Sequence, residues 1–280
     1  MSEPGAQPSH AAPPDSSRRL LEAVTVVTND RLSEGVGLLV LGAPRIAAAV
    51  APGQFVHLRI ARGADFLLRR PFSVHRAGAG RIEILYQVLG RGTAVLAERR
   101  PGDVMDAIGP LGTGFRVPHG IAHAAVIAGG LGVAPMGMLV ERLADAGVSV
   151  TVALGAPTRE RLVALPLFES TARHVLVCTE DGSLGTQGRV TEVLAEAFAD
   201  GPQVAYVCGP EAMTRAVADV CAASRVACQV SLERLMACGV GACLSCVVTL
   251  RSGSARACVD GPVFDAEEVC WETSEIPPRH

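Results

Sequence analysis

Four cysteines near the C-terminus of this 280-residue chain have a spacing that is typical of redox metal centres. They are Cys238, Cys243, Cys246 and Cys258, and the gaps between them hold four, two and eleven residues. The first three repeat the spacing with which plant-type proteins hold a [2Fe–2S] cluster through cysteine thiolates. The sequence therefore predicts a [2Fe–2S] cluster with these four cysteines as its ligands.

Small residues fill the gaps between the first three cysteines. Gly239, Gly241, Ala242 and Ser245 would let the backbone fold closely around a cluster and point its amides at the sulfur atoms. A structural zinc site in a non-redox interaction protein is the alternative. Zinc ligands usually come as two separated pairs, however, and a gap of four followed directly by a gap of two suits tetrahedral closure poorly.

Composition and charge argue against several kinds of partner. The formal net charge is −3 and no basic stripe is present, so we expect no nucleic-acid partner. Although 49% of the residues are hydrophobic, no run of about 18 apolar residues occurs, so we expect no membrane span. Nine cysteines without a secretory signal predict a reducing, cytoplasmic location. Residues 1–19, rich in Pro, Ser and Ala, are expected to form a disordered tail.

The rest of the chain divides into parts with different hydrophobic patterns. Residues 20–118 hold short β-branched runs between turns, which predicts a small antiparallel β-barrel. Residues 119–232 alternate near-continuous apolar strands with helical stretches, which predicts a parallel α/β sheet. Residues 233–280 hold the cysteines and a hairpin-like segment with a turn at Ser252-Gly253. The expected fold is thus a β domain, an α/β domain and a small C-terminal cluster module.

The α/β part carries two glycine turns at strand ends. In AAVIAGGLGVAPMGMLV, a buried strand leads into a turn with Gly129, Gly130 and Gly132, and then into a helix that Pro135 would open. The second turn, Cys208-Gly209-Pro210, ends a later strand in YVCGPEAM. Because both turns would lie at the carboxyl edge of one sheet, together they predict a dinucleotide site in the crevice between them.

Two short motifs in the barrel half suit contacts to phosphate and flavin. Arg70-Pro71-Phe72-Ser73 joins a fixed charge to a rigid turn and a hydroxyl, and Gly90-Arg91-Gly92-Thr93 gives a glycine turn with a second hydroxyl. Taken alone, either motif is better explained by a surface arginine or an ordinary hairpin turn, because short isolated motifs carry little information.

The order of these features resembles the ferredoxin-reductase-type flavoprotein family. A barrel with RPFS and a GT turn is followed by GGLGVAP, by CGPEAM and by a C-terminal cluster loop. The cluster placed last, with CVDGPVFDAEEVCW after it, resembles the electron-transfer subunits of NAD-dependent (class 1B) dihydroorotate dehydrogenases. The resemblance runs from about Val24 to Trp271, and its most specific stretches are RRPFSV, GPLGTGF, EDGSLGTQG, ACGVGACLSC and DGPVF.

This resemblance implies FAD and a [2Fe–2S] cluster as cofactors and NAD as co-substrate. It assigns the same four cysteines to the cluster. The residues that it implies for FAD are Arg70, Pro71, Phe72 and Ser73 as contacts, Leu85, Tyr86 and Gln87 along the isoalloxazine, and Gly92 and Thr93 around the pyrophosphate. One departure is Gln87, where the family pattern favours arginine.

The resemblance also implies a relay in pyrimidine biosynthesis. In that family, an FMN-containing catalytic subunit oxidises dihydroorotate, and electrons pass through the cluster and FAD to NAD within a heterotetramer. This chain would be the relay and not the site of dihydroorotate oxidation, so no catalytic residue is expected in it. Consistent with this, it shows neither the eight βα repeats of a (β/α)₈ barrel nor a recognisable pyrimidine site. The alternative is an NAD(P)H-dependent flavin and iron–sulfur reductase that serves another acceptor, of the sulfide, ferredoxin:NADP oxidoreductase or hydrogenase type.

The type of dinucleotide is predicted from a third strand end. Thr179-Glu180-Asp181 follows the strand HVLVC, where relatives that use NADP tend to present a Ser-Arg pair to the 2′-phosphate. Two carboxylates would repel that phosphate and could accept a hydrogen bond from a ribose hydroxyl. We therefore expect NAD to be preferred over NADP.

Overall fold

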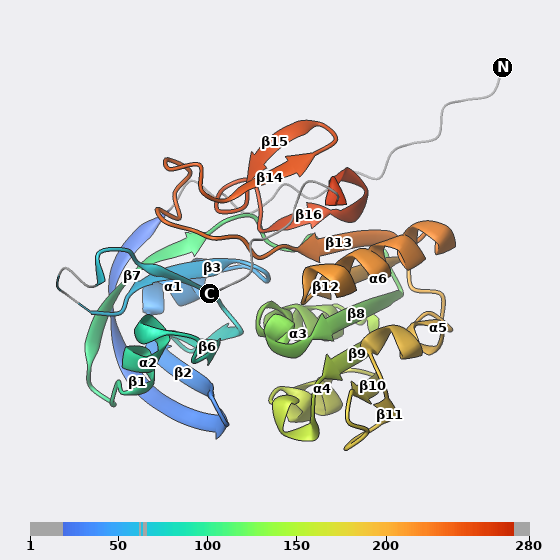
Figure 1. The fold of residues 1–280 in the computed structure, drawn as a ribbon, viewed down its shortest axis with the longest axis horizontal. Coiled ribbons are helices and arrows are strands. Elements are labelled where there is room, and N and C mark those ends of the chain that lie inside the picture. Colours follow the sequence, from blue (N-terminus) through green and yellow to red (C-terminus); the bar gives the residue numbers. More distant parts are fainter. Residues whose placement is uncertain (1–18, 62, 64–65, 272–280) are drawn as a thin grey trace.

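The computed structural model describes residues 19–61, 63 and 66–271. The predicted disordered tail lies outside the described residues, apart from Arg19. Two large sheets lie side by side, and a small hairpin packs over both of them at the top of Figure 1.

The first sheet is antiparallel and strongly curved, as Figure 1 shows on its left. Its spatial order is β4-β3-β7-β1-β2-β6-β5, and every neighbouring pair is antiparallel. The sheet and its two short helices consist of β1 (Leu20–Ser33), β2 (Val36–Gly42), α1 (Pro44–Ala49), β3 (Phe55–Arg59), β4 (Arg70–Ser73), β5 (Arg76–Gly78), β6 (Arg81–Gln87), α2 (Arg91–Ala97) and β7 (Val104–Leu111). This agrees with the predicted antiparallel β domain.

The first sheet encloses a core of its own, to which alternate apolar residues of its strands contribute. Leu39 and Leu41 on β2 face Ile82 and Ile84 on β6 across the same interior, and all four are fully buried. Side chains of a strand point to opposite faces in turn, so one face fills this core and the other is left for neighbouring parts of the chain.

The second sheet is the predicted parallel α/β sheet. Its order is β11-β10-β9-β8-β12-β13-β16, and only β16 runs antiparallel to its neighbour. The strands are β8 (His123–Gly129), β9 (Ser149–Ala156), β10 (His174–Thr179), β11 (Thr186–Gln187), β12 (Val204–Cys208), β13 (Ala227–Ser231) and β16 (Val263–Asp265). The helices around it are η2 (Gly130–Met136), α3 (Gly137–Asp145), η3 (Arg159–Arg161), α4 (Leu165–Thr171), η4 (Val190–Val193), α5 (Leu194–Ala197) and α6 (Glu211–Ser224).

Helices on both faces explain why these strands read as continuous apolar runs. On β8, Ile127 belongs to the core that includes Val217 of α6, whereas Val126 belongs to the core that includes Leu139 of α3. A strand that is buried on both faces has no polar side to alternate with.

The C-terminal part begins with the cysteine loop and continues into the predicted hairpin. The hairpin pairs β14 (Val247–Leu250) with β15 (Gly253–Arg256), and Leu250 faces Gly253 across it, so Arg251 and Ser252 form the turn. The chain then returns through β16, which pairs with β13 and is followed by η5 (Ala266–Glu268). The cluster module is thereby joined to the second sheet by strand pairing.

Two local predictions were wrong. The segment Arg70–Ser73 is the edge strand β4 and not a rigid turn, an arrangement that suits proline because an edge strand leaves some amides unpaired. Pro135 does not open an α-helix, since it lies inside the 3₁₀ helix η2 and α3 begins two residues later at Gly137. In the part of the chain that the structure describes, no helix is long and apolar enough to cross a membrane.

Candidate cofactor and cluster site

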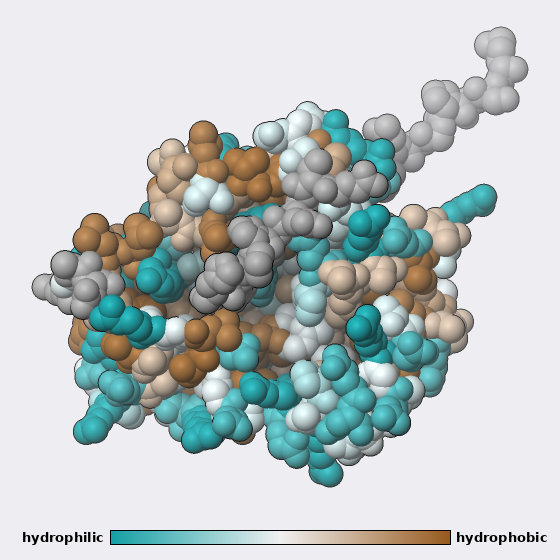
Figure 2. Space-filling model, in the orientation of Figure 1, coloured by the Kyte–Doolittle hydropathy of each residue, from teal (hydrophilic) through white to brown (hydrophobic). Residues whose placement is uncertain are grey.

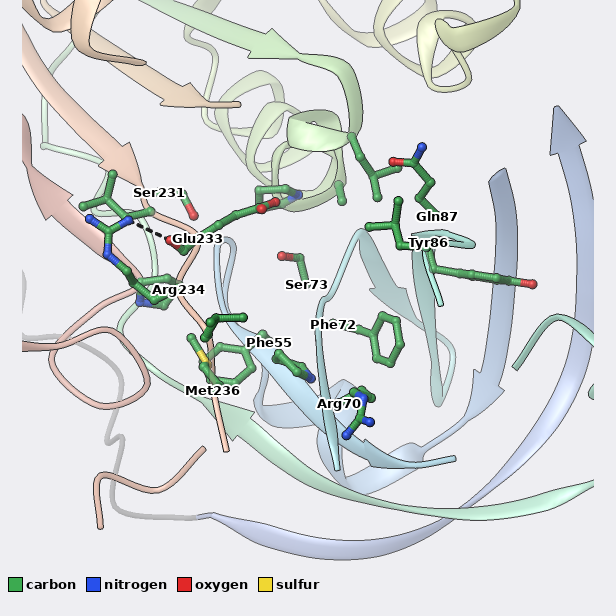
Figure 3. Close-up of a pocket in the computed structure, with 18 of the residues that line it drawn as sticks. Phe55, Arg70, Phe72, Ser73, Tyr86, Gln87, Ser231, Glu233, Arg234 and Met236 are labelled. Carbon is green, nitrogen blue, oxygen red and sulfur yellow. Dashed lines mark hydrogen bonds between the residues drawn. The ribbon is translucent and has the colours of Figure 1, made fainter. Parts of the chain in front are cut away.

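A cavity of about 600 Å³ lies where the two sheets and the cysteine module meet (Figure 3). The first sheet contributes β4, β6 and the start of α2, and the second contributes η2 and the end of β12. The third wall is the segment from Ser231 to Ala237, together with Ser245 and Pro262. All three parts of the chain thus share one site.

The barrel side of the cavity offers an anion site. Arg70 donates from Nη1 to the carbonyl oxygen of Leu68 at 2.8 Å, and a Cβ placed on Gly92 would lie 3.4 Å from Nε of Arg70. The arginine therefore lies against the first turn of α2. Thr93 accepts hydrogen bonds at Oγ1 from the amides of Leu89 and Gly90, at 2.9 and 3.3 Å. A guanidinium beside helix-start amides is a suitable environment for a pyrophosphate.

Strand β6 turns its side chains alternately toward and away from this cavity. The hydroxyl of Tyr86 donates to Oδ1 of Asn29 at 2.8 Å, and the ring packs in the barrel core (Figure 3). Burial raises the pKa of this phenol. Leu85 packs instead with the core on the side of the second sheet. The Tyr86 ring therefore points into the barrel core, although Tyr86 is also among the residues that line the cavity.

On the opposite wall, the two predicted glycine turns are in contact. A Cβ on Gly132 would overlap the carbonyl oxygen of Cys208, and one on Gly129 would lie 2.5 Å from Sδ of Met213 and 3.1 Å from Cδ of Pro210. These glycines are needed because they let the ends of β8 and β12 approach each other. At Gly130, a Cβ would meet nothing within 4 Å, so the turn is open there.

The contact between the turns lies where the strand order reverses. From β8 the chain proceeds outward to β9 and β10, and it then returns to β12 on the other side of β8. Dinucleotides bind at such a switch point in open α/β sheets. Of the predicted residues, Cys208 lines the cavity directly, and Gly129, Gly130, Gly132, Gly209 and Pro210 form the turns behind it.

Sequence reasoning missed Glu233, which lies in the segment that leads to the cysteines. In Figure 3, Glu233 and Ser73 point toward each other across the cavity. Burial and the nearby Glu233 raise the pKa of the Cys208 thiol to about 12, so Cys208 stays a neutral thiol. The next residue, Arg234, pairs with Glu211 at 3.3 Å and fixes this segment to the start of α6. The sequence did offer one indication of this site, because the acidic Glu233 and the basic Arg234 stand next to each other shortly after a buried strand.

The loop that carries Cys238 and Cys243 has the geometry expected of a cluster loop. The backbone amides of Val240, Ala242 and Cys243 all point at Sγ of Cys238, at 3.4, 3.3 and 3.4 Å. Gly239 and Gly241 have φ of +69° and +86°, which glycine adopts without strain. Amides directed at a sulfur stabilise a thiolate, as the small residues in the sequence predicted.

The four thiols gather as two pairs. Cys243 interacts with Cys238, and the buried Cys258 interacts with the buried Cys246. Hydrogen bonds from Ser245 lower the pKa of the Cys243 thiol to about 6, whereas burial raises the pKa of Cys258 to about 12. Within the described residues, no three His, Cys, Asp or Glu side chains meet the geometry of a single metal ion. Four thiols gathered in one loop region could hold a two-iron cluster.

Two family models match the chain. The iron-sulfur cluster binding domain of dihydroorotate dehydrogenase B matches residues 233–270, which contain all four cysteines. The oxidoreductase NAD-binding domain matches residues 126–219, which contain both glycine turns.

Curated relatives match most of the chain. The dihydroorotate dehydrogenase B (NAD(+)) electron transfer subunit of Desulforamulus reducens is 42% identical over 82% of this chain and 90% of its own. The subunit of the same name from Bacillus caldolyticus is 40% identical over 89% of this chain and 98% of its own. This chain belongs to the family of dihydroorotate dehydrogenase B electron transfer subunits.

Solved structures agree with the family fold. The structure of an NADH-dependent reduced ferredoxin-NADP oxidoreductase has a TM-score of 0.81 and 29% identity, and covers 89% of this chain and 90% of that one. A ferredoxin NADP+ reductase from Neisseria gonorrhoeae has a TM-score of 0.63 at 16% identity, over 73% of this chain and 91% of that one, and shows the shared fold alone.

Membership of the family confirms the resemblance that the sequence suggested. The predicted oxidoreductase fold is confirmed, and the iron–sulfur and NAD-binding parts of the predicted cofactor set match family domains. The flavin-reductase fold supports FAD as the third part. Of the residues predicted for FAD, Arg70, Pro71, Phe72, Ser73, Leu85, Tyr86, Gln87 and Thr93 border the cavity, and Gly92 lies against Arg70.

Proposed function

We propose that this chain relays electrons from a dihydroorotate-oxidising catalytic subunit to NAD. When bound, FAD exchanges hydride with NAD and single electrons with a [2Fe–2S] cluster, so it connects two-electron and one-electron chemistry. The protein's part is to hold these groups next to one another and to exclude water from between them.

The observation that carries this proposal is the shared wall between the cavity and the cluster loop. Ala237 and Ser245 line the cavity, and each directly precedes a predicted cluster ligand, Cys238 and Cys246. The amide of Ala237 donates to Oγ of Ser245 at 3.2 Å, which closes the loop on the cavity side. A flavin in this cavity would lie beside the cluster with one layer of residues between them.

Each wall of the cavity has its own role in the proposal. Arg70 and the first turn of α2 would hold the pyrophosphate of FAD, and β4 and β6 would flank the isoalloxazine. The turns at Gly130 and Gly209 would receive NAD, and the neutral thiol of Cys208 would border the nicotinamide. The carboxylate of Glu233 would lie near the ring that takes or gives hydride.

The partner would be an FMN-containing dihydroorotate dehydrogenase catalytic subunit, in a heterotetramer. Support comes from exposed apolar residues on the cysteine module, where Leu235, Leu244 and Val247 are 59%, 62% and 41% exposed. In Figure 2, apolar surface gathers at the top and on the left, where this module and the first sheet lie. Such surface around a redox centre suits a stable interface.

Cys178, Cys221 and Cys228 are free thiols, in keeping with a cytoplasmic location.

The experiment is co-expression of the chain with the catalytic subunit from the same genome, followed by anaerobic assay. We expect a co-eluting complex that reduces NAD when dihydroorotate is added, and a chain that binds FAD and about two irons. The Cys243→Ser variant should lose dihydroorotate-dependent NAD reduction while NADH still reduces artificial acceptors. Elution of the two proteins as separate species at micromolar concentration, or a colourless chain that contains zinc, would contradict the proposal.

A further inference from the structure

His57 is a buried histidine on the face of β3 that looks away from the barrel core. Its neighbours Val56 and Leu58 belong to that core, so the alternation of the strand places His57 and Phe55 on the other face. The His57 side chain is fully buried, and neither ring nitrogen has a regular hydrogen bond among the residues that the structure describes. Phe55 fills the same face with an apolar ring, 6.5 Å away between centroids. Packing alone therefore does not explain a polar ring at this position.

The surface that the His57 ring meets is the cluster loop. A Cβ placed on Gly239 would lie 2.6 Å from Nδ1 of His57 and 3.0 Å from Cε1, so Gly239 rests directly on the edge of the imidazole. An imidazole carries at least one N–H, so the ring brings a hydrogen-bond donor to this contact. The backbone of Cys238 faces the ring, at a geometry looser than that of a regular hydrogen bond.

Phe55 extends this contact to the flavin cavity. Its ring packs edge to face with His57 at an interplanar angle of 87°, and Phe55 itself lines the cavity (Figure 3). A continuous line of contact thus leads from the cavity through Phe55 and His57 to the first predicted cluster ligand. Both rings stand on β3, which is an inner strand paired on both sides and therefore rigid.

We propose that His57 is a positioning residue for the cluster, whose imidazole supports the Cys238–Gly239 segment and whose N–H directs the backbone of Cys238, so that the first ligand keeps a fixed place relative to the flavin cavity. This inference rests on the ligand assignment in the proposed function and goes beyond it, since it gives a residue of the barrel a role at the cluster. It also explains why residue 239 must lack a side chain: a methyl group there would enter the imidazole.

A double-mutant cycle tests the contact between the ring and the loop. The variants are His57→Ala, Gly239→Ala and the two together, with iron and sulfide per chain as the readout and FAD content as the measure of correct folding. We expect Gly239→Ala alone to hold about tenfold less iron. In the double variant most of that iron should return, because the clash is gone and only the strain of a positive φ remains.

Gly241→Ala is the matched control. The three atoms nearest to its Cβ would belong to Val259, at 2.8 Å, and Arg256, not to His57, and its φ is also positive. Its loss of iron should therefore be the same with and without His57→Ala. Strictly additive losses for Gly239→Ala and His57→Ala would overturn the inference while leaving the cluster assignment intact. A parent chain without iron would overturn both together.

A second comparison separates the N–H from the volume of the ring. His57→Gln keeps an N–H donor, and His57→Leu has similar bulk without one. We expect the cluster of His57→Leu to show an altered electron paramagnetic resonance spectrum and a lower midpoint potential, because a dipole that favours the added electron is lost. His57→Gln should stay close to the parent in both. Equal spectra and potentials for the two variants, with FAD fully bound, would refute the role of the N–H.

Discussion

Nδ1 of His75, in the segment between β4 and β5, lies 3.0 Å from the carbonyl oxygen of Ala134 on η2. A carbonyl can only accept, so the proton of this imidazole resides on Nδ1. The amide of Met138 donates in turn to the carbonyl of His75 at 2.8 Å, and a Cβ on Gly137 would lie 2.6 Å from Cε1 of the ring. This histidine therefore joins the barrel to the second sheet by contacts on several sides.

The buried His75 should make the stability of the chain depend on pH. Burial lowers the pKa of His75 in the native chain to about 4, whereas a histidine in the unfolded chain has a pKa of about 6.5. Between these two pH values, the unfolded chain binds a proton at this position and the native chain does not. Stability is then lost as the pH falls through this window, by about 2 kcal/mol between pH 7.5 and 5. In urea unfolding, His75→Gln should show a smaller loss than the parent chain. His119→Gln, at an exposed position, should follow the parent, and parallel curves for all three would contradict the prediction.

Replacement of a cluster ligand should remove iron without removing flavin. For Cys243→Ser we expect iron to fall from about two atoms per chain to nearly none, because serine is a poor ligand for this centre, while FAD stays bound by the barrel. Iron analysis and the visible spectrum check this. Cys228→Ser, a half-buried cysteine on β13, is the control and should keep its iron. Full iron in all four single ligand variants would refute the assignment.

The guanidinium of Arg70 should contribute to FAD binding. Loss of a charge-assisted hydrogen bond to phosphate costs about 1.5–3 kcal/mol, so Arg70→Ala should raise the Kd for FAD by roughly 10–100-fold. Flavin fluorescence on titration of the apoprotein measures this. Arg81→Ala, an exposed arginine at the start of β6, should bind as the parent does. Identical affinities for the two variants would remove Arg70 from the flavin site.

Selectivity between NAD and NADP should depend on the carboxylates after β10. Hydrogen bonds from Ser183 lower the pKa of Asp181, so this carboxylate is anionic at neutral pH, and Glu180 beside it is exposed. We expect NAD to have the higher kcat/KM. Glu180→Gln should raise kcat/KM for NADP by about threefold, the scale of an exposed charge, with NAD unchanged. Glu196→Gln on α5 is the matched control. A higher kcat/KM for NADP in the parent chain would show that the carboxylate argument is wrong.

A methyl group at Gly132 should separate the two dinucleotide turns. Because its Cβ would overlap the carbonyl of Cys208, Gly132→Ala should destabilise the chain by about 1–3 kcal/mol and weaken NAD binding. Thermal unfolding and NADH titration check both effects. Gly78→Ala, where a Cβ meets nothing within 4 Å, should leave both unchanged. Normal NADH affinity in Gly132→Ala would show that the turns need not touch.

Features that depend on local sequence could be predicted. Strands such as β8 and β12 are buried on both faces and therefore read as apolar runs, and α6 begins and ends where its helical pattern does. The cysteine loop was predicted because three of its ligands lie within nine residues and their spacing is specific.

Features set by distant parts of the chain could not be predicted. The side on which Tyr86 lies depends on the register of β6 with β2, and β16 is a three-residue strand whose partner β13 is far back in the chain. The role of His57 could not be predicted because its contact with Gly239 joins two segments that are far apart in the sequence. The motif RPFS was predicted to be a turn because proline is uncommon in strands, although an edge strand such as β4 tolerates it.

The return of β16 to the second sheet has a consequence for any shortened form of this protein. Val263 and Phe264 are buried against the sheet, and Phe264 pairs in register with Val230 of β13. A truncation after Leu232 would remove this strand and leave the outer edge of β13 with unpaired amides and carbonyls beside bare apolar surface. Edges of that kind recruit other chains and aggregate. The nucleotide-binding half therefore needs the cluster module in order to stay monodisperse, whether or not the chain takes part in electron transfer.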